Sequence, residues 1–382
     1  MQNGTAMAFK PSEGHGTISW QRQWLLHLLC FVLPGLTLAM FVTGPHDWWI
    51  APATIGFISF IVLAERLAPV DKRQPMEGEP KWMFDLQCYA LTVLQLACHV
   101  ALGVMASKLS IDRPIELVAN LVGMLALGGT TAGYTGIVLA HEWIHRRKAH
   151  QLFMGRLLLM FVWYEHFATE HIRGHHPGLG KHTDAATARF GESFREFYFR
   201  TLPAQFKSAW RLEKVRIGEP TMSNLDPRMI KHRVLQGVIA QIGITVGYYV
   251  LWGPIAMVFF LLQARSAFGL LEAVNYMEHW GITRANPKRV TPVDSWDTDN
   301  WLTLHTLIGL SRHADHHAQA SRPYQQLRHF EESPQMPRGY YGTILMLMTR
   351  NDTYQKLCTD ELKARELGPF RPGLVETADA AE

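Results

Sequence analysis

Six long apolar blocks alternate with polar segments along this chain of 382 residues. Each block has about the ~20 residues that a helix needs to cross the ~30 Å hydrocarbon layer of a membrane. Charges are almost absent from the block interiors, whereas a helix on the surface of a soluble protein usually carries a polar stripe. The pattern therefore predicts an all-α integral membrane protein with six transmembrane helices, rather than a large soluble protein with apolar core helices. The blocks cover residues 24–42, 48–70, 86–106, 115–140, 234–250 and 252–273.

The basic residues of the polar segments predict the orientation of these spans. Three short connections follow the first, third and fifth blocks, and they hold only Lys108 and Arg113 as basic residues. Nearly all other lysines and arginines lie on the opposite side, which the positive-inside bias assigns to the cytoplasm. Both termini are then cytoplasmic, as an even number of spans requires. The connections are residues 43–47, residues 107–113 and the turn around Gly253 and Pro254.

Charge and cysteine content exclude several classes of function. The net charge of +4 is modest, and no run of basic residues accompanies a base-reading motif. The basic residues are better explained by topology and by anionic lipid headgroups than by nucleic acid. None of the four cysteines forms a CxxC pair, so the chain has neither a disulfide framework nor an iron–thiolate motif.

The blocks also predict the domain organisation. We expect a cytoplasmic N-terminal tail over residues 1–22, a six-span domain over residues 23–347 and a cytoplasmic C-terminal tail over residues 348–382. The last residues, 375–382, are acidic and rich in alanine, and we expect them to be disordered.

Nine of the 19 histidines gather in four short motifs at the ends of these blocks. Histidines four residues apart lie on the same face of a helix. Neutral imidazole suits iron, zinc and copper, so the clusters indicate a metal site beside the membrane. The motifs are HEWIH, EHIRGHH, NYMEH and HADHH, at residues 141–145, 170–176, 275–279 and 313–317.

The number of histidines predicts two metal ions. One metal takes at most six ligands, so nine imidazoles imply two ions with four or five each and positions left open for oxygen. The first motif alone is also the zinc-protease signature, but that interpretation needs only one further ligand. His279 stands by itself, and it is included because Glu278 lies beside it. The candidate ligands are His141, His145, His171, His175, His176, His279, His313, His316 and His317.

Carboxylates near the motifs are candidates for orienting the imidazoles, since metal-bound histidines usually donate their second N–H to such a group. The alternative for each is a solvated charge or a helix cap. The candidate catalytic-site carboxylates are Glu142, Glu170, Asp184, Glu278 and Asp315. Of the remaining histidines, His166, His182 and His305 are the nearest alternatives to the nine, and we expect them to be structural or surface residues.

These motifs resemble those of the membrane alkane monooxygenases, the AlkB family, within the histidine-rich membrane di-iron desaturases and hydroxylases. That family carries HExxH followed by a basic residue, here Arg146, and EHxxGHH, which this chain matches in full. It also carries NYxEHYG, where this chain has Trp280 for the second tyrosine. Its LQRHSDHHA motif is matched with Ser311 and Ala314 as departures.

The resemblance implies that the nine histidines hold two iron ions at the cytoplasmic face of six spans in a bacterial inner membrane. It implies hydroxylation of the terminal methyl of medium-chain alkanes to primary alcohols, with O₂ as co-substrate. Two electrons would come from a rubredoxin or ferredoxin-type carrier and its flavoprotein reductase. This chain lacks the CxxC pairs of rubredoxin, so the carrier must be separate. Basic residues suited to docking an acidic carrier are Arg146, Arg147, Lys148, Arg312 and Arg322.

The departures from the family motifs leave other substrates open. The second interpretation is a methyl-group hydroxylase of alkyl-aromatic or terpene substrates, of the xylene monooxygenase type, and the third is a fatty-acyl desaturase or hydroxylase. A non-enzymatic alternative is a membrane metal transporter, although transport sites usually lie near the bilayer midplane. Bulky residues on the spans either end the substrate pocket or face lipid; these are Trp48, Trp49, Phe57 and Phe60.

Overall fold

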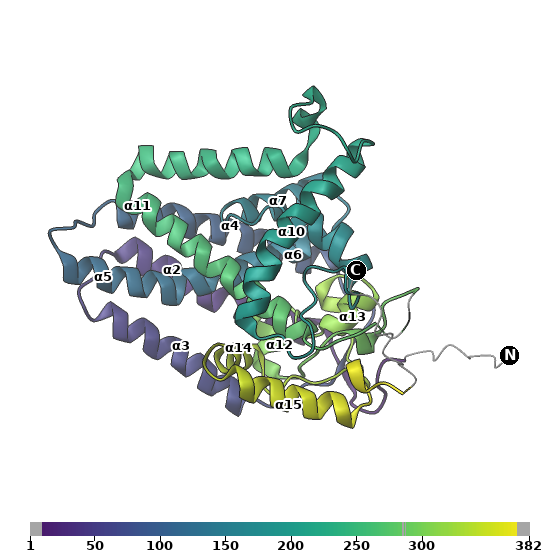
Figure 1. The fold of residues 1–382 in the computed structure, drawn as a ribbon. Coiled ribbons are helices and arrows are strands. Elements are labelled where there is room, and N and C mark those ends of the chain that lie inside the picture. Colours follow the sequence, from purple (N-terminus) through teal and green to yellow (C-terminus); the bar gives the residue numbers. More distant parts are fainter. Residues whose placement is uncertain (1–9, 285, 287, 373–382) are drawn as a thin grey trace.

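A bundle of long helices, with a layer of short helices and loops at one end, makes up the protein (Figure 1). The computed structural model describes residues 10–284, 286 and 288–372. The residues expected to be disordered, 375–382, lie outside this range. Strands are short in the described chain: β1 (Thr17–Ile18) pairs in parallel with β2 (Gln74–Pro75). The all-helical prediction is therefore confirmed.

Five helices are long and apolar enough to cross a membrane by length and composition. The first combines α1 (Trp20–His27), η1 (Leu28–Phe31) and α2 (Val32–Thr43). The others are α3 (Ile50–Leu67), α4 (Lys81–Ala106), the continuous helix Pro114–Ile144 and α11 (Arg233–His279). All six predicted apolar blocks lie in these helices, because α11 contains the last two.

The helix α11 is bent into two arms at Gly253 (Figure 1). The backbone of Gly253 has φ 87°, a left-handed value that glycine adopts without a Cβ penalty. Pro254 follows and has no N–H to continue the helical hydrogen bonds. The turn that the sequence predicts here is thus present, and the two arms correspond to the fifth and sixth apolar blocks.

The continuous helix Pro114–Ile144 carries the first histidine motif at its end. It comprises α5 (Pro114–Gly123), two π-helical stretches, η2 (Met124–Gly129) and η3 (Ala132–Ile137), and α6 (Val138–Ile144). A π-helical turn contains one more residue than an α-helical turn and is often found near functional sites. The fourth apolar block therefore runs on into the histidines.

The three short connections between spans lie at the end of the bundle opposite α12 and α13 (Figure 1). All four histidine motifs lie at the other end, where most of the short helices are found. The elements of this layer are α7 (Ala149–Met160), α8 (Phe167–Glu170), η4 (His171–His175), α9 (His176–Gly178), α10 (Phe194–Ile217), η5 (Pro227–Lys231), η6 (Pro292–Asp294), α12 (Trp301–Thr306), α13 (His313–Ala318), η7 (Tyr324–Gln326), α14 (Tyr340–Thr349), α15 (Asn351–Ala364) and η8 (Gly368–Phe370).

Part of the expected C-terminal tail is a packed helix. The helix α15 buries Tyr354, Cys358 and Leu362 and lies against α14. Those three residues are spaced four apart, so they form one apolar stripe on an otherwise polar helix. The amphipathic pattern was too short and too polar to predict a span, and it forms instead part of the layer around the histidines.

The packing of the long helices differs between the centre and the outside of the bundle. The helix α4 packs against both α2 and α11, and its Phe84, Cys88 and Leu91 are fully buried. By contrast α3 exposes large apolar residues such as Phe60 and Leu63. A contiguous apolar exterior on long helices is the surface expected for contact with lipid.

Candidate metal centre

Five elements bring the nine predicted histidines together. His141 lies in the last turn of α6, and His145 is the residue that ends this helix. The π-helical turn η4 and the start of α9 present His171, His175 and His176. His279 is the last residue of α11, and α13 carries the remaining three.

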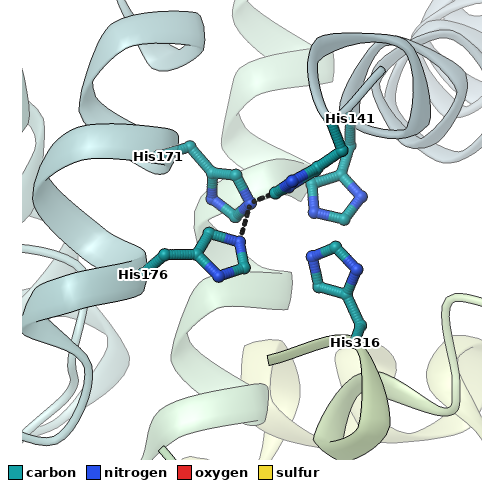
Figure 2. Close-up of side chains that lie close together, drawn as sticks. His141, His171, His176 and His316 are labelled. Carbon is teal, nitrogen blue, oxygen red and sulfur yellow. Dashed lines mark hydrogen bonds between the residues drawn. The ribbon is translucent and has the colours of Figure 1, made fainter. Parts of the chain in front are cut away.

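Five of these histidines form a first group. The ligand atoms of its members all lie within 4.8 Å of one another. The Nε2 atom of His171 lies 3.1 Å from Nε2 of His145 and 3.0 Å from Nε2 of His176. Figure 2 shows the rings of this group turned toward one shared space. We call it the five-histidine group; it comprises His141, His145, His171, His176 and His316.

The other four histidines form a second group beside the first. His175, His279 and His317 have ligand atoms within 4.8 Å of one another, and His313 joins them because its Nε2 lies 2.9 Å from Nε2 of His317. We call it the four-histidine group. The two groups adjoin, since the ring centroids of His176 and His317 are 4.4 Å apart.

Many nitrogen atoms of these rings have no hydrogen-bond partner although they are buried. They include Nε2 of His141, His175 and His316 and both ring nitrogens of His279. A buried polar atom normally has a partner, so a cluster of this kind indicates an ion between the rings. Burial, together with the neighbouring imidazoles, holds the pKa of His171, His176, His316 and His317 well below the ordinary value. These rings are then neutral, which is the form that binds a metal.

Two of the predicted carboxylates contact the four-histidine group. The Asp184 Oδ2 atom lies 2.9 Å from Nδ1 of His175, and it also accepts a hydrogen bond of 2.6 Å from the Thr187 hydroxyl. Burial alone would lower the pKa of His175, but the Asp184 carboxylate more than offsets it, so this pKa is raised. Because Asp184 takes Nδ1, the Nε2 atom of His175 is left to face the other rings.

Glu278 lies between the four-histidine group and a tyrosine. Its Oε2 atom is 3.0 Å from Nε2 of His313, and its Oε1 atom accepts a hydrogen bond of 2.5 Å from the Tyr340 hydroxyl. Its carboxylate also falls within 4.8 Å of the ligand atoms of His279 and His313. Glu278 is therefore close enough to act as a ligand as well as to orient an imidazole.

The other carboxylates lie differently from the expectation. Glu142 pairs with Arg146 at 2.6 Å, and Asp315 pairs with Arg328 at 3.1 Å. No contact recorded among the described residues joins either carboxylate to an imidazole of the nine, so an orienting role for them is not supported. Their spacing of one or two residues from a histidine turns each away from that histidine on its own helix, and the arginines Arg146 and Arg328 take up the two carboxylates instead.

Glu170 is buried beside the centre without contacting a ligand ring. Burial, reinforced by the nearby Asp184 carboxylate, raises the pKa of Glu170 to about 8. The side chain occupies the space that Gly174 leaves, since a Cβ on Gly174 would collide with the Glu170 carboxylate. The glycine of the second motif thus makes room for this acid.

Three further histidines lie outside both groups. The ring of His166 lies against Tyr164 at a tilt of 58°, and burial lowers the pKa of His166 to about 3. His305 contacts Asp71 at 3.3 Å, and His182 is exposed. None of these histidines shares a metal-binding arrangement with the nine among the described residues.

Residues that the motifs do not contain complete the surroundings of the centre. Tyr340 and Thr187 hold the two carboxylates, and neither was a candidate from the sequence. Their chemistry gave no signal in the sequence, because a hydroxyl finds its partner only through the tertiary fold.

A small apolar cavity of about 30 Å³ opens on the histidines. His141, His171 and His313 form one side of it, and Tyr134, Leu270 and Val274 lie among the residues of its walls. The cavity is bordered by η3 and by the second arm of α11. An apolar space next to neutral imidazoles suits a molecule that offers no hydrogen bonds.

The bulky residues proposed from the sequence lie elsewhere. Trp48, Trp49 and Phe60 are 67, 46 and 62 % exposed, and Phe57 is half-buried. None of the four lines the cavity. The exposure of Trp48, Trp49 and Phe60 favours the alternative in which they face lipid, whereas Phe57 packs against the core.

Comparison with known proteins gives a family match and several similar relatives. The family described as fatty acid desaturase matches residues 117–345, which is more than half of the chain. Alkane 1-monooxygenase 1 from Pseudomonas aeruginosa is 39 % identical over 232 residues, which cover 59 % of this chain and 60 % of that protein. Alkane 1-monooxygenase 2 from the same organism is 32 % identical over 313 residues, or 80 % of this chain and 81 % of that protein.

A more distant relative bears on the alternative substrate. The xylene/toluene monooxygenase hydroxylase component XylM from Pseudomonas putida is 23 % identical over 326 residues, covering 85 % of each chain. The matched family segment contains all nine histidines of the two groups.

Proposed function

Because this chain belongs to the fatty acid desaturase family and, within it, to the alkane 1-monooxygenases, we propose that it hydroxylates the terminal methyl of medium-chain alkanes to primary alcohols. The observation that carries the proposal is the convergence of nine imidazoles, buried or partly buried, in two adjoining groups, three members of which line an apolar cavity. The relatives at 32–39 % identity carry the name of this activity.

The residues present fit a pair of iron ions. Imidazole nitrogen is a suitable ligand for iron, and the unpartnered Nε2 atoms of His141, His175 and His316 are buried where a ligand would be needed. The five-histidine group would hold one ion and the four-histidine group the other, with Glu278 available to the second. Bound iron would provide the site at which O₂ is reduced with two electrons from the carrier.

The chain's own residues would hold the substrate and exclude water. The walls formed by residues such as Leu270 and Val274 keep water from the reacting end of the substrate. Burying an alkyl chain contributes about 0.8 kcal/mol for each CH₂, and no hydrogen bond distinguishes one alkane from the next. Discrimination between neighbouring chain lengths is then weak, and product mixtures are expected.

The arrangement of basic residues supports six crossings with the histidines on the cytoplasmic side. Each of the five long helices crosses the membrane in this arrangement, and the two arms of α11 cross separately. The connections at the far end hold only Lys108 and Arg113 as basic residues, which agrees with the positive-inside bias. In a bacterial cell the membrane would be the inner membrane, with both termini in the cytoplasm.

A separate acidic carrier, a rubredoxin or ferredoxin-type protein with its flavoprotein reductase, would deliver the electrons. Of the basic residues considered for docking, Arg147 and Lys148 are exposed. Arg312 is buried and donates to the carbonyl oxygens of Leu327 and Arg73. Arg146 pairs with Glu142 and Arg322 with Asp315, so these three arginines already have partners within the chain. Docking by charge complementarity would therefore depend on the first two.

The remaining candidate functions have weaker support. Hydroxylation of methyl groups on aromatic rings or terpenes keeps the same centre, and the 23 % identity to the xylene/toluene component favours it less than the alkane relatives. A fatty-acyl substrate would need a site for its polar head. A metal transporter would need its ligands near the bilayer midplane, whereas these histidines lie at one end of the bundle.

The test uses cells that co-express this chain with a rubredoxin and its reductase. The cells receive a mixture of medium-chain alkanes, toluene derivatives and a terpene, and the products are separated by gas chromatography with mass detection. Terminal alkanols as the main products are the expected result. Benzylic or terpene alcohols without alkanols would contradict the alkane assignment and retain the hydroxylase chemistry.

A further inference from the structure

A groove of about 570 Å³ lies between α3 and α14, away from the histidines. Its walls are largely apolar, with Val62 and Leu63 from α3 and Leu345 and Met346 from α14. The groove is set where α3 reaches its last turn, at the end of the bundle that holds the histidines (Figure 1). The groove therefore lies on a lipid-facing surface, at the level where the predicted spans end.

Three arginines border this groove. Arg66, Arg338 and Arg350 line it, and all three are exposed. Among the described residues, none of them forms an ion pair with a carboxylate, whereas other arginines of this layer, such as Arg146 and Arg328, do. Three arginines without a recorded ion-pair partner at one largely apolar groove favour an anion with an apolar part.

The single acid of the groove, Glu65, forms no ion pair with these arginines among the described residues, although it interacts electrostatically with Arg338. Its Oε1 atom accepts hydrogen bonds from the Thr303 hydroxyl at 2.5 Å and from the Tyr341 N–H at 3.0 Å. Its Oε2 atom accepts from the Gly342 N–H at 2.6 Å, and the residue is 1 % exposed. The carboxylate is therefore used to fix the first turn of α14 against α3, which builds the groove.

We propose that this groove binds one anionic phospholipid from the leaflet on the histidine side. The phosphate lies among Arg66, Arg338 and Arg350, and an acyl chain lies along Leu63 and Leu345. The charge complementarity favours a phospholipid over the hydrocarbon substrate, because an alkane has no group for three guanidinium ions to bind. Guanidinium groups also match phosphate geometry through paired N–H donors. The inference does not depend on the reaction that the protein performs.

The test measures the thermal unfolding midpoint of the purified full-length protein in a neutral detergent. Phosphatidylglycerol, phosphatidylcholine, inorganic phosphate and dodecane are titrated separately. We expect phosphatidylglycerol to raise the midpoint more than any of the other three. The variant Arg66→Gln/Arg338→Gln/Arg350→Gln should lose most of this increment.

A matched variant distinguishes a built site from general charge. Lys181→Gln/Arg195→Gln/Lys356→Gln removes three exposed basic residues that do not line the groove, and it should keep the increment. The single variant Arg350→Gln covers the case in which the triple variant does not fold, and it should weaken phosphatidylglycerol binding about fivefold, the effect of one basic residue beside an anionic headgroup. The proposal fails if the groove variants keep the full increment, if both triple variants lose it equally, or if phosphatidylcholine, inorganic phosphate or dodecane stabilises the protein as well as phosphatidylglycerol does.

Discussion

The two histidine groups differ in what holds their rings. In the four-histidine group, His175 contacts Asp184 and His313 contacts Glu278, and these carboxylates are themselves bound by Thr187 and Tyr340. In the five-histidine group, no ion pair among the described residues joins a ring to a carboxylate, and the closest neighbours of each ring are other imidazoles. His175 is thus oriented by a carboxylate on its second nitrogen, whereas Glu278 contacts the same Nε2 atom of His313 that faces His317. The rings of the five-histidine group are positioned by the helices that carry them.

This difference has a physical consequence for the two proposed iron sites. A carboxylate that accepts the second N–H of a ligand fixes the ring and raises its basicity. The four-histidine group gains this support while having fewer imidazoles. We therefore expect the two sites to respond differently when the surroundings of the ligands are changed, and alike when a ligand itself is removed.

The largest effect should come from removing a ligand of the five-histidine group. His171→Ala and His316→Ala should each abolish hydroxylation, because each deletes a nitrogen that faces the shared space. Iron per protein is measured together with turnover. His182→Ala is the matched control, since this histidine is exposed and outside both groups. Full activity in either ligand variant would contradict the assignment.

A smaller effect is expected from Asp184→Asn, which keeps the size of the side chain and removes its charge. Loss of such a carboxylate typically costs about 10- to 100-fold in metal affinity or activity. We expect the loss to be confined to one of the two iron ions, which Mössbauer spectra of the iron-57 protein would detect. Glu142→Gln provides the comparison, because Glu142 contacts Arg146 and not an imidazole. Equal loss of iron in both variants would argue against the difference between the groups.

The smallest effect is expected from Tyr340→Phe, which removes one hydrogen bond to Glu278. A single hydrogen bond contributes about 0.5–1.5 kcal/mol, so activity should fall by about tenfold or less. The measurement is turnover with iron content as a second readout. A loss as large as that of a ligand variant would mean that the tyrosine itself acts on the substrate.

The long apolar helices were predictable because their length and composition are visible in the sequence. Every predicted apolar block lies in a long helix, and the turn at Gly253 and Pro254 is present. The layer around the histidines was less predictable. The short helix α14 is as apolar as a span, but with Tyr340–Thr349 it has only 10 residues. Length distinguishes a helix that can cross the membrane from a short helix that packs in the layer around the histidines, whereas apolar composition alone does not.

The membership of the two groups could not be predicted from spacing. His316 belongs to the five-histidine group and His317 to the four-histidine group, although they are neighbours in the chain. Adjacent residues on a helix point in directions about 100° apart, so each faces a different group of histidines. Sequence spacing identifies which histidines share a face of their own helix. The partners on other helices depend on how η4, α11 and α13 pack.

The π-helical stretches η2 and η3 determine the direction in which His141 points around the helix axis. Each lies between the start of its helix at Pro114 and the histidine, and each accommodates a residue beyond the α-helical count. Loss or gain of a single residue in this stretch would turn everything after it by about 100° about the helix axis. The number of residues from Pro114 to His141 therefore decides the direction in which His141 points. Side chains along this stretch can change, but an insertion or a deletion would turn His141 away from the other histidines.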